Sequence, residues 1–138
     1  MHSTKRLLIV LAGGSPVATA PAGLAFRYAV TAAALDLLVE IHVVGESVKL
    51  LQKSFAGNSD QTDRTLGDAI QSEPFSEQGL SSQVRLMKSM DVKLFVCSAA
   101  LADAGLTLMD LIPEIDGVRG AAAMLAAGLA EDARILSF

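Results

Sequence analysis

Cys97 is the residue of this sequence whose type and position most clearly favour chemistry. It ends the hydrophobic run of residues 92–97, and a stretch that begins at Ser98 and is typical of a short helix follows it. A thiol at such a junction is expected to lie near unpaired backbone N–H groups and the positive end of a helix dipole, and both favour the reactive thiolate. Free cysteines are also among the most buried residue types, so packing as a small hydrophobic side chain is the alternative.

Cys97 is the single cysteine of the chain. This count excludes an internal disulfide framework, a CxxC redox pair and a cysteine-based zinc site. The sulfur chemistry of the chain is therefore that of one thiol.

Gly13, Gly14 and Ser15 form a second candidate site, for binding rather than catalysis. They follow a hydrophobic run, and their flexible backbone amides could form a nest for an anion. The spacing matches neither a P-loop nor GxGxxG, and no lysine follows where a phosphate would need it. A tight turn is the alternative.

The remaining polar candidates do not form a recognisable centre. His42 has no carboxylate at a catalytic spacing, and we interpret it, like His2, as structural or solvent-facing. Asp110, Glu114 and Asp116 are scattered carboxylates, which usually mark a solvated surface. We therefore expect no metal and no cofactor.

Length and composition limit the class of protein. The 138 residues predict one domain, residues 1–138. A net charge of −4 without a basic cluster argues against nucleic acid as a partner. The first apolar run is too short for a signal peptide, and residues 120–130 are about half the ~20 residues of a membrane span. We expect a soluble, cytoplasmic protein.

Hydrophobic periodicity predicts alternating strands and helices. The predicted strands are residues 7–12, 39–44, 92–97, 115–118 and 133–138, and the predicted helices are 22–35, 47–54, 76–90, 98–104 and 120–130. Gly105 is expected to end the helix at 98–104 in the left-handed conformation. Residues 55–75 are polar and predict a surface excursion. This order predicts an α/β fold: a three-layer α/β/α sandwich with a mainly parallel sheet of about five strands.

Two features predict self-association. Only 19% of the residues are charged, against 51% apolar, which leaves little charged surface for a lone globule. The predicted helix at 22–35 is apolar nearly all round, so one side should meet the sheet and the other a helix or subunit.

The segment KLFVCSAALADAG at residues 93–105 resembles the active-cysteine segment of the DsrE/TusD sulfurtransferase family, also described as DsrE/DsrF-like. Other segments, in the same order as in that family, are similar to it along most of the chain: LLIVLAGG (7–14), AFRYA (25–29), VVGESV (43–48), GVRGAA (117–122) and DARILSF (132–138).

The resemblance implies a function. It suggests a sulfur-relay protein that carries sulfane sulfur as a persulfide on Cys97 and hands it to a small carrier of the TusA type. It also implies a homotrimer or hexamer. Ser98 and the following backbone amides would stabilise the anion, and residues 13–21 would form a wall of the pocket. Residues 55–75 are longer and more polar than in compact members, which leaves the partner open.

Three other functions stay open from the sequence. The chain could be a non-catalytic subunit of an oligomer, because some members of the family lack the cysteine. It could be a flavodoxin-like binder of a small molecule such as a flavin or nucleotide. A one-cysteine peroxidase would need a base or arginine close to the thiol, and the sequence places neither.

Overall fold

A computed structural model describes residues 5–53, 55 and 79–138 of the chain. Its centre is a five-stranded, all-parallel sheet in the order β4-β3-β2-β1-β5. The strands are β1 (Arg6–Leu11), β2 (Leu38–Val43), β3 (Lys93–Cys97), β4 (Gly117–Arg119) and β5 (Ala133–Ser137). The helices are α1 (Ala20–Ala34), α3 (Leu80–Ser89), α4 (Ser98–Ala104) and α5 (Ala121–Gly128), with 3-10 turns η1 (Gly45–Leu51) and η2 (Leu108–Asp110).

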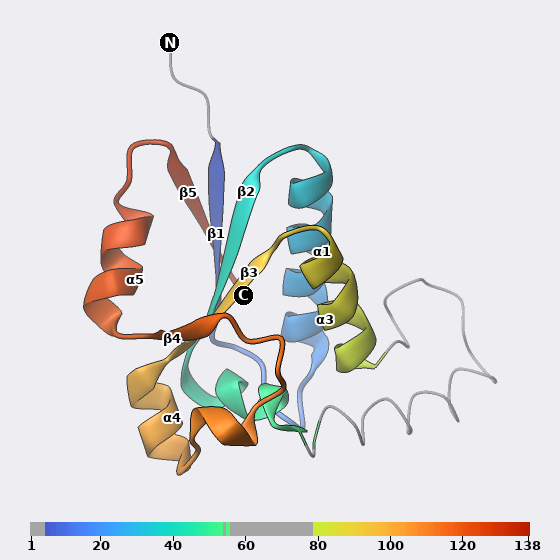
Figure 1. The fold of residues 1–138 in the computed structure, drawn as a ribbon, viewed down its shortest axis with the longest axis vertical. Coiled ribbons are helices and arrows are strands. Elements are labelled where there is room, and N and C mark those ends of the chain that lie inside the picture. Colours follow the sequence, from blue (N-terminus) through green and yellow to red (C-terminus); the bar gives the residue numbers. More distant parts are fainter. Residues whose placement is uncertain (1–4, 54, 56–78) are drawn as a thin grey trace, which may run out of the picture.

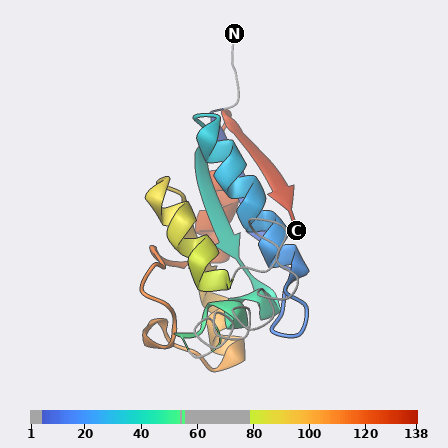
Figure 2. The same ribbon diagram turned by 90° about the vertical axis from the view of Figure 1, so that its right-hand side faces the viewer.

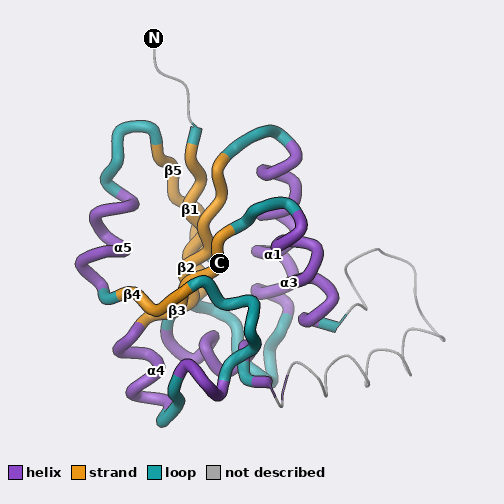
Figure 3. Tube along the Cα trace, in the orientation of Figure 1, coloured by secondary structure: helices purple, strands orange, loops and turns teal. Residues whose placement is uncertain are grey.

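The helices form layers on the two faces of this sheet. Helices α1 and α3 lie side by side on one face, and α5 lies on the other (Figures 1 and 2). Helix α4 and the two 3-10 turns gather beyond the carboxyl ends of the strands (Figure 3). The α/β fold with a parallel sheet, predicted from the alternation of strands and helices, is confirmed.

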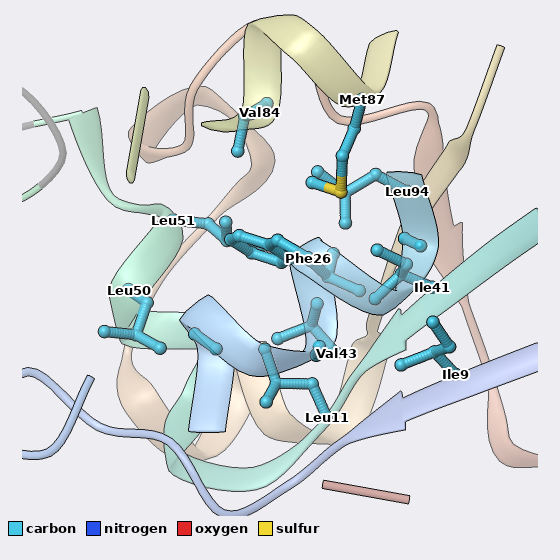
Figure 4. Close-up of a cluster of buried hydrophobic side chains, with 14 of the residues drawn as sticks. Ile9, Leu11, Phe26, Ile41, Val43, Leu50, Leu51, Val84, Met87 and Leu94 are labelled. Atoms are coloured by element: carbon cyan, nitrogen blue, oxygen red, sulfur yellow. The ribbon is translucent and has the colours of Figure 1, made fainter. Parts of the chain in front are cut away.

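The main core lies between the sheet and the α1–α3 layer. Alternate residues of the strands point into it, as the two-residue period of a strand requires. Phe26 of α1 is fully buried at its centre. Figure 4 shows the cluster, whose labelled members are Ile9, Leu11, Phe26, Ile41, Val43, Leu50, Leu51, Val84, Met87 and Leu94.

The opposite face is covered more thinly. None of the residues of α5 is buried. At Gly128 the helix comes close to the sheet, since a Cβ there would lie 2.8 Å from Cδ1 of Ile135 and 3.8 Å from Cδ2 of Leu8. Leu125 and Leu129, in contrast, are 63% and 73% exposed. This helix therefore presents apolar side chains outward as well as inward.

The local predictions differ from the structure in a few places. Pro21 lies in the first turn of α1, where its missing N–H is harmless, and not in the loop before the helix. Residues 45–51 form a 3-10 turn in place of the expected helix. Gly105 ends α4 with φ 70°, as predicted. The surface excursion expected at residues 55–75 falls, except for Phe55, outside the described residues.

Candidate functional site

Cys97 lies where β3 ends and α4 begins. It is the last residue of the strand and the N-cap residue of the helix, with an extended backbone (φ −77°, ψ 128°). The residue is partly exposed, and it packs on one side against the main core. The thiol therefore has the strand-to-helix position that the sequence predicted, and it is not sealed inside the protein.

Ser98 is the first residue of α4 and is exposed. Ser98 does not cap this helix, because Cys97 is the capping residue and no side chain donates or accepts a capping hydrogen bond there. Its hydroxyl instead lies toward the start of α5: a Cβ at Gly120 would be 3.9 Å from Oγ of Ser98. Helices α4 and α5 thus begin close together, each at the end of one of two neighbouring strands.

Residues Gly13, Gly14 and Ser15 lie at the end of β1, and β2 separates that strand from β3 and Cys97. Their backbone N–H groups all donate within the chain: Gly13 to the Phe138 carbonyl (2.9 Å), Gly14 to Oγ of Ser47 (2.9 Å) and Ser15 to the Ala18 carbonyl (3.0 Å). The Ser15 bond closes a tight turn, and the other two fix the loop to distant parts of the chain, so all three N–H groups are already satisfied.

A polar cluster that sequence reasoning missed lies on the same face of the sheet as Cys97. His42 of β2 pairs in register with Phe95 of β3, and Cys97 pairs with Arg119 of β4. Register partners in a sheet share a face, as do residues two apart on one strand. Glu40, His42, Phe95, Cys97 and Arg119 therefore all project from the face that carries α5.

Glu40 holds this cluster together. Its Oε1 lies 3.0 Å from Nη1 of Arg119 and 3.2 Å from Nε2 of His42. Because a guanidinium has no acceptor, Arg119 donates to Glu40. His42 donates to the same oxygen in the tautomer that carries its proton on Nε2, and in the other tautomer its Nε2 accepts from Nη1 of Arg119 at 3.4 Å. The Arg119 guanidinium carbon lies 3.6 Å from the centre of the Phe95 ring, a cation–π contact. His42, interpreted from the sequence as structural or solvent-facing, is buried and lies within hydrogen-bond distance of Glu40.

His42 is 1% exposed, and burial lowers its pKa below the ordinary value of 6.5. The hydrogen bond and the negative charge of Glu40 raise the pKa, while the charge of Arg119 lowers it again. The imidazole is therefore neutral at pH 7. The cluster then holds one negative charge, on Glu40, and one positive charge, on Arg119.

Asp110 and Asp116, two of the acidic residues considered from the sequence, have structural partners. Oδ2 of Asp116 accepts hydrogen bonds from the Leu94 N–H (2.7 Å) and from the Lys88 ammonium group. Asp110 caps the η2 turn through the Thr107 N–H (2.8 Å). Among the described residues, no group of three or more His, Cys, Asp or Glu side chains could hold a metal ion. No helix in that part of the chain is both long and apolar enough to cross a membrane.

Comparisons with known proteins agree with this architecture. The model of the DsrE/DsrF-like family matches residues 5–138. The ychN protein from E. coli is similar in structure, with a TM-score of 0.66 and 12% identity over 96% of this chain and 99% of that chain. MTH1491 of Methanobacterium thermoautotrophicum, a protein of unknown function, has a TM-score of 0.65 and 14% identity over 96% and 98%. At such identities the two structures show the fold alone. No curated protein matches the chain.

Proposed function

Since this chain belongs to the DsrE/DsrF-like family, we propose that it is a cytoplasmic sulfur-relay protein in which Cys97 carries sulfane sulfur as a persulfide. The observation that supports this most strongly is the position of Cys97: partly exposed, at the end of β3 and directly before α4. A residue there is partly exposed to a reaction partner, and it lies at the N-terminal end of α4, where the first backbone N–H groups of a helix have no partner within the helix.

The proposed reaction has two displacement steps. The Cys97 thiolate attacks the outer sulfur of a donor persulfide, polysulfide or thiosulfate, which forms a new S–S bond and releases the rest of the donor with the electron pair of the broken bond. The thiolate of an acceptor then attacks the outer sulfur of the Cys97 persulfide and releases Cys97 as thiolate. A TusA-like carrier protein is the acceptor we propose.

A chain with one cysteine suits a sulfur carrier. A second thiol within reach would attack the persulfide, form an internal disulfide and release the sulfur as sulfide. With Cys97 alone, the persulfide persists until an external thiol takes the sulfur.

Other residues have supporting roles in this proposal. Ser98, exposed beside the thiol at the start of α4, offers a hydroxyl to the persulfide anion. Gly13, Gly14 and Ser15 contribute a wall of the site and not an anion nest, because their N–H groups are already used in internal hydrogen bonds.

We also propose that the chain functions as a homotrimer or hexamer. All eight residues of α5 are alanine, methionine, leucine or glycine, and none of them is buried in the single chain. A helix of that composition usually has a partner on every side. A second copy of the chain would cover Leu125 and Leu129 and would remove apolar surface from water.

One observation favours a second function. A one-cysteine peroxidase needs an arginine or a base near its thiol, and Arg119 is the register partner of Cys97. In that case the Cys97 thiolate would attack hydrogen peroxide, become a sulfenic acid and require an external thiol for reduction. Steady consumption of peroxide by the wild type, lost in Cys97→Ser, would favour this alternative.

Sulfur loading tests the proposed function directly. The native protein is incubated with polysulfide or thiosulfate, and its intact mass is compared with that of Cys97→Ser. A gain of whole sulfur atoms in the wild type alone is the expected result. No gain in either protein, together with slow labelling of the native thiol by a small reagent, would instead indicate a non-catalytic subunit. A purified protein that carries a flavin or nucleotide absorbance would favour the small-molecule binder.

A further inference from the structure

Arg119 has more hydrogen-bond donors than its contacts use. In the part of the chain that the structure describes, its polar contacts are with Glu40 and His42, and both involve Nη1. A guanidinium carries five N–H donors in a fixed fork, and a carboxylate usually takes two of them at once. The ion pair with Glu40 therefore leaves Nε and Nη2 for another acceptor. The side chain is 27% exposed, so a small molecule can reach it.

Arg119 is the neighbour of Cys97 on the adjacent strand. Arg119 and Cys97 are register partners, and neighbouring strands are about 4.8 Å apart. The guanidinium lies over Phe95, which precedes Cys97 by two residues on the same face, a step of about 6.6 Å along the strand. These spacings place the guanidinium on the same face of the sheet as the thiol, over the residue two positions before it.

Among the described residues, Glu40 is the negative charge paired with Arg119. Glu40 belongs to β2, across β3 from the strand of Arg119, and it pairs in register with Lys93, four residues before Cys97. His42 is neutral and adds no charge. The planar face of the guanidinium rests on the Phe95 ring, which leaves its edge for hydrogen bonds.

We propose that Arg119 binds the anionic end of the sulfur compound that reacts at Cys97, so that this site selects donors with an oxyanion group next to the reacting sulfur. This inference rests on the proposed function and names its substrate class. The paired N–H donors of a guanidinium match the geometry of the oxygens in such groups, and a neutral chain of sulfur atoms has no such oxygens.

Inorganic thiosulfate illustrates the step. The Cys97 thiolate attacks the outer sulfur, the S–S bond of thiosulfate breaks, and sulfite leaves with the electron pair. Cys97 becomes a persulfide anion, and no oxidant or reductant is consumed. Arg119 binds the sulfonate oxygens before the attack and offsets the charge of the leaving sulfite. An organic thiosulfonate anion presents the same chemistry, with a sulfinate as the leaving group.

The charge selectivity of Cys97 tests this role without any sulfur transfer. Native protein is alkylated with iodoacetate and with iodoacetamide, which share a leaving group and differ in charge. The rate with the anion iodoacetate is divided by the rate with neutral iodoacetamide, and this ratio is compared among variants. The ratio cancels any change in the amount of thiolate. We expect Arg119→Gln to lower it by about tenfold, Arg119→Lys to lower it less, and Glu40→Gln to raise it.

Arg134→Gln is the matched control, because it removes the same charge from β5 at the far edge of the sheet, where Arg134 contacts its neighbouring Ala133 carbonyl. Its ratio should equal that of the wild type. Misfolding would not explain opposite effects of Arg119→Gln and Glu40→Gln. An Arg119→Gln ratio equal to that of Arg134→Gln would overturn the proposal.

Loading with two donors separates this inference from the proposed function. We expect Arg119→Gln to slow loading from thiosulfate by about tenfold. The same variant should leave the attack of Cys97 on neutral diallyl trisulfide, measured as the S-allyl disulfide adduct that forms as allyl persulfide leaves, within a factor of about two. If Arg119 binds the oxyanion group, Arg119→Gln should slow loading from an organic thiosulfonate anion as much as loading from thiosulfate. If the variant slows loading from thiosulfate alone, the site is specific for the inorganic anion. Equal slowing with thiosulfate and the trisulfide would contradict the role of Arg119. No loading of the wild type from any donor would contradict the sulfur-relay function, while the alkylation ratio would still decide whether Arg119 binds anions.

Discussion

Ser47 and Gly14 are joined by two hydrogen bonds across 33 positions of the chain: Oγ of Ser47 accepts from the Gly14 N–H at 2.9 Å and donates to the Gly14 carbonyl at 2.8 Å. Both residues are buried. This pair fixes the loop after β1 to the η1 turn, which in turn packs against α4, the helix that begins after Cys97.

Replacement of Ser47 by alanine should therefore destabilise the protein. Ser47→Ala leaves a buried N–H and a buried carbonyl without partners, and we expect the free energy of unfolding to fall by about 2–3 kcal/mol. Urea denaturation measures this loss. The control is Ser89→Ala, an exposed serine whose hydroxyl donates to the Leu86 carbonyl, which should stay within about 0.5 kcal/mol of the wild type. A Ser47→Ala protein as stable as this control would show that the two bonds do not hold the loop.

Asp116 should contribute stability that disappears in acid. Partial burial raises the pKa of Asp116, but the hydrogen bonds from Lys88 and the Leu94 N–H outweigh it, so the pKa lies below the ordinary 3.8. A carboxyl group with a depressed native pKa stabilises the fold above its unfolded pKa, and this contribution is lost as pH falls through the native value. We expect Asp116→Asn to lose about 1–2 kcal/mol at pH 7.

The same comparison should be made at lower pH. The difference between wild type and Asp116→Asn should shrink steadily below pH 3.8. A difference that stayed constant from pH 7 to the lowest pH at which both proteins fold would mean that the charge of Asp116 is not responsible.

His42 should make stability depend on pH in a higher range. Its native pKa lies below 6.5, so the unfolded chain takes up a proton near pH 6.5 while the native protein stays neutral. Stability therefore falls as pH drops below 6.5, with a slope of at most about 1.4 kcal/mol per pH unit. Chemical denaturation between pH 7 and 5.5 should show this slope in the wild type and a smaller slope in His42→Gln. Identical slopes in the two proteins would place the titration elsewhere.

The outward face of α5 should determine the oligomeric state. We expect light scattering coupled to gel filtration to show a trimer or hexamer for the wild type. Leu125→Glu and Leu129→Glu place a charge among apolar groups that a second copy would cover, and they should shift the protein to smaller species. Leu86→Glu on α3, also an exposed leucine, should keep the wild-type mass. A monomeric wild type would contradict self-association.

The positions of the strands and helices followed from local patterns. The run at residues 7–12 is apolar throughout because β1 is covered on both faces of a parallel sheet. Gly105 could be placed at the end of α4 because a left-handed residue there favours glycine. The position of Cys97 followed from the same kind of local signal, the change from an apolar strand to small helical residues.

The surroundings of Cys97 depend on pairing between distant strands, which the sequence does not display. The predicted fourth strand ended at residue 118, so Arg119 lay outside it, and the register that joins Arg119 to Cys97 was not foreseeable. One signal was present. Glu40 and His42 alternate with apolar residues in a strand at the centre of the sheet, and polar side chains on a covered face need partners. That argument would have predicted a cation nearby without identifying it.

A pulse-chase measurement on the sulfur atom tests the sulfur-carrier function most directly. The protein is loaded with a sulfane donor labelled with a heavy sulfur isotope, separated from excess donor, and mixed with a TusA-like carrier, and the intact masses of both proteins are followed. We predict that the wild type carries the label on Cys97 and loses it as the acceptor gains it, while Cys97→Ser never acquires it. A label that never enters the wild type, or that leaves it only as free sulfide, would contradict the proposal that this protein relays sulfur.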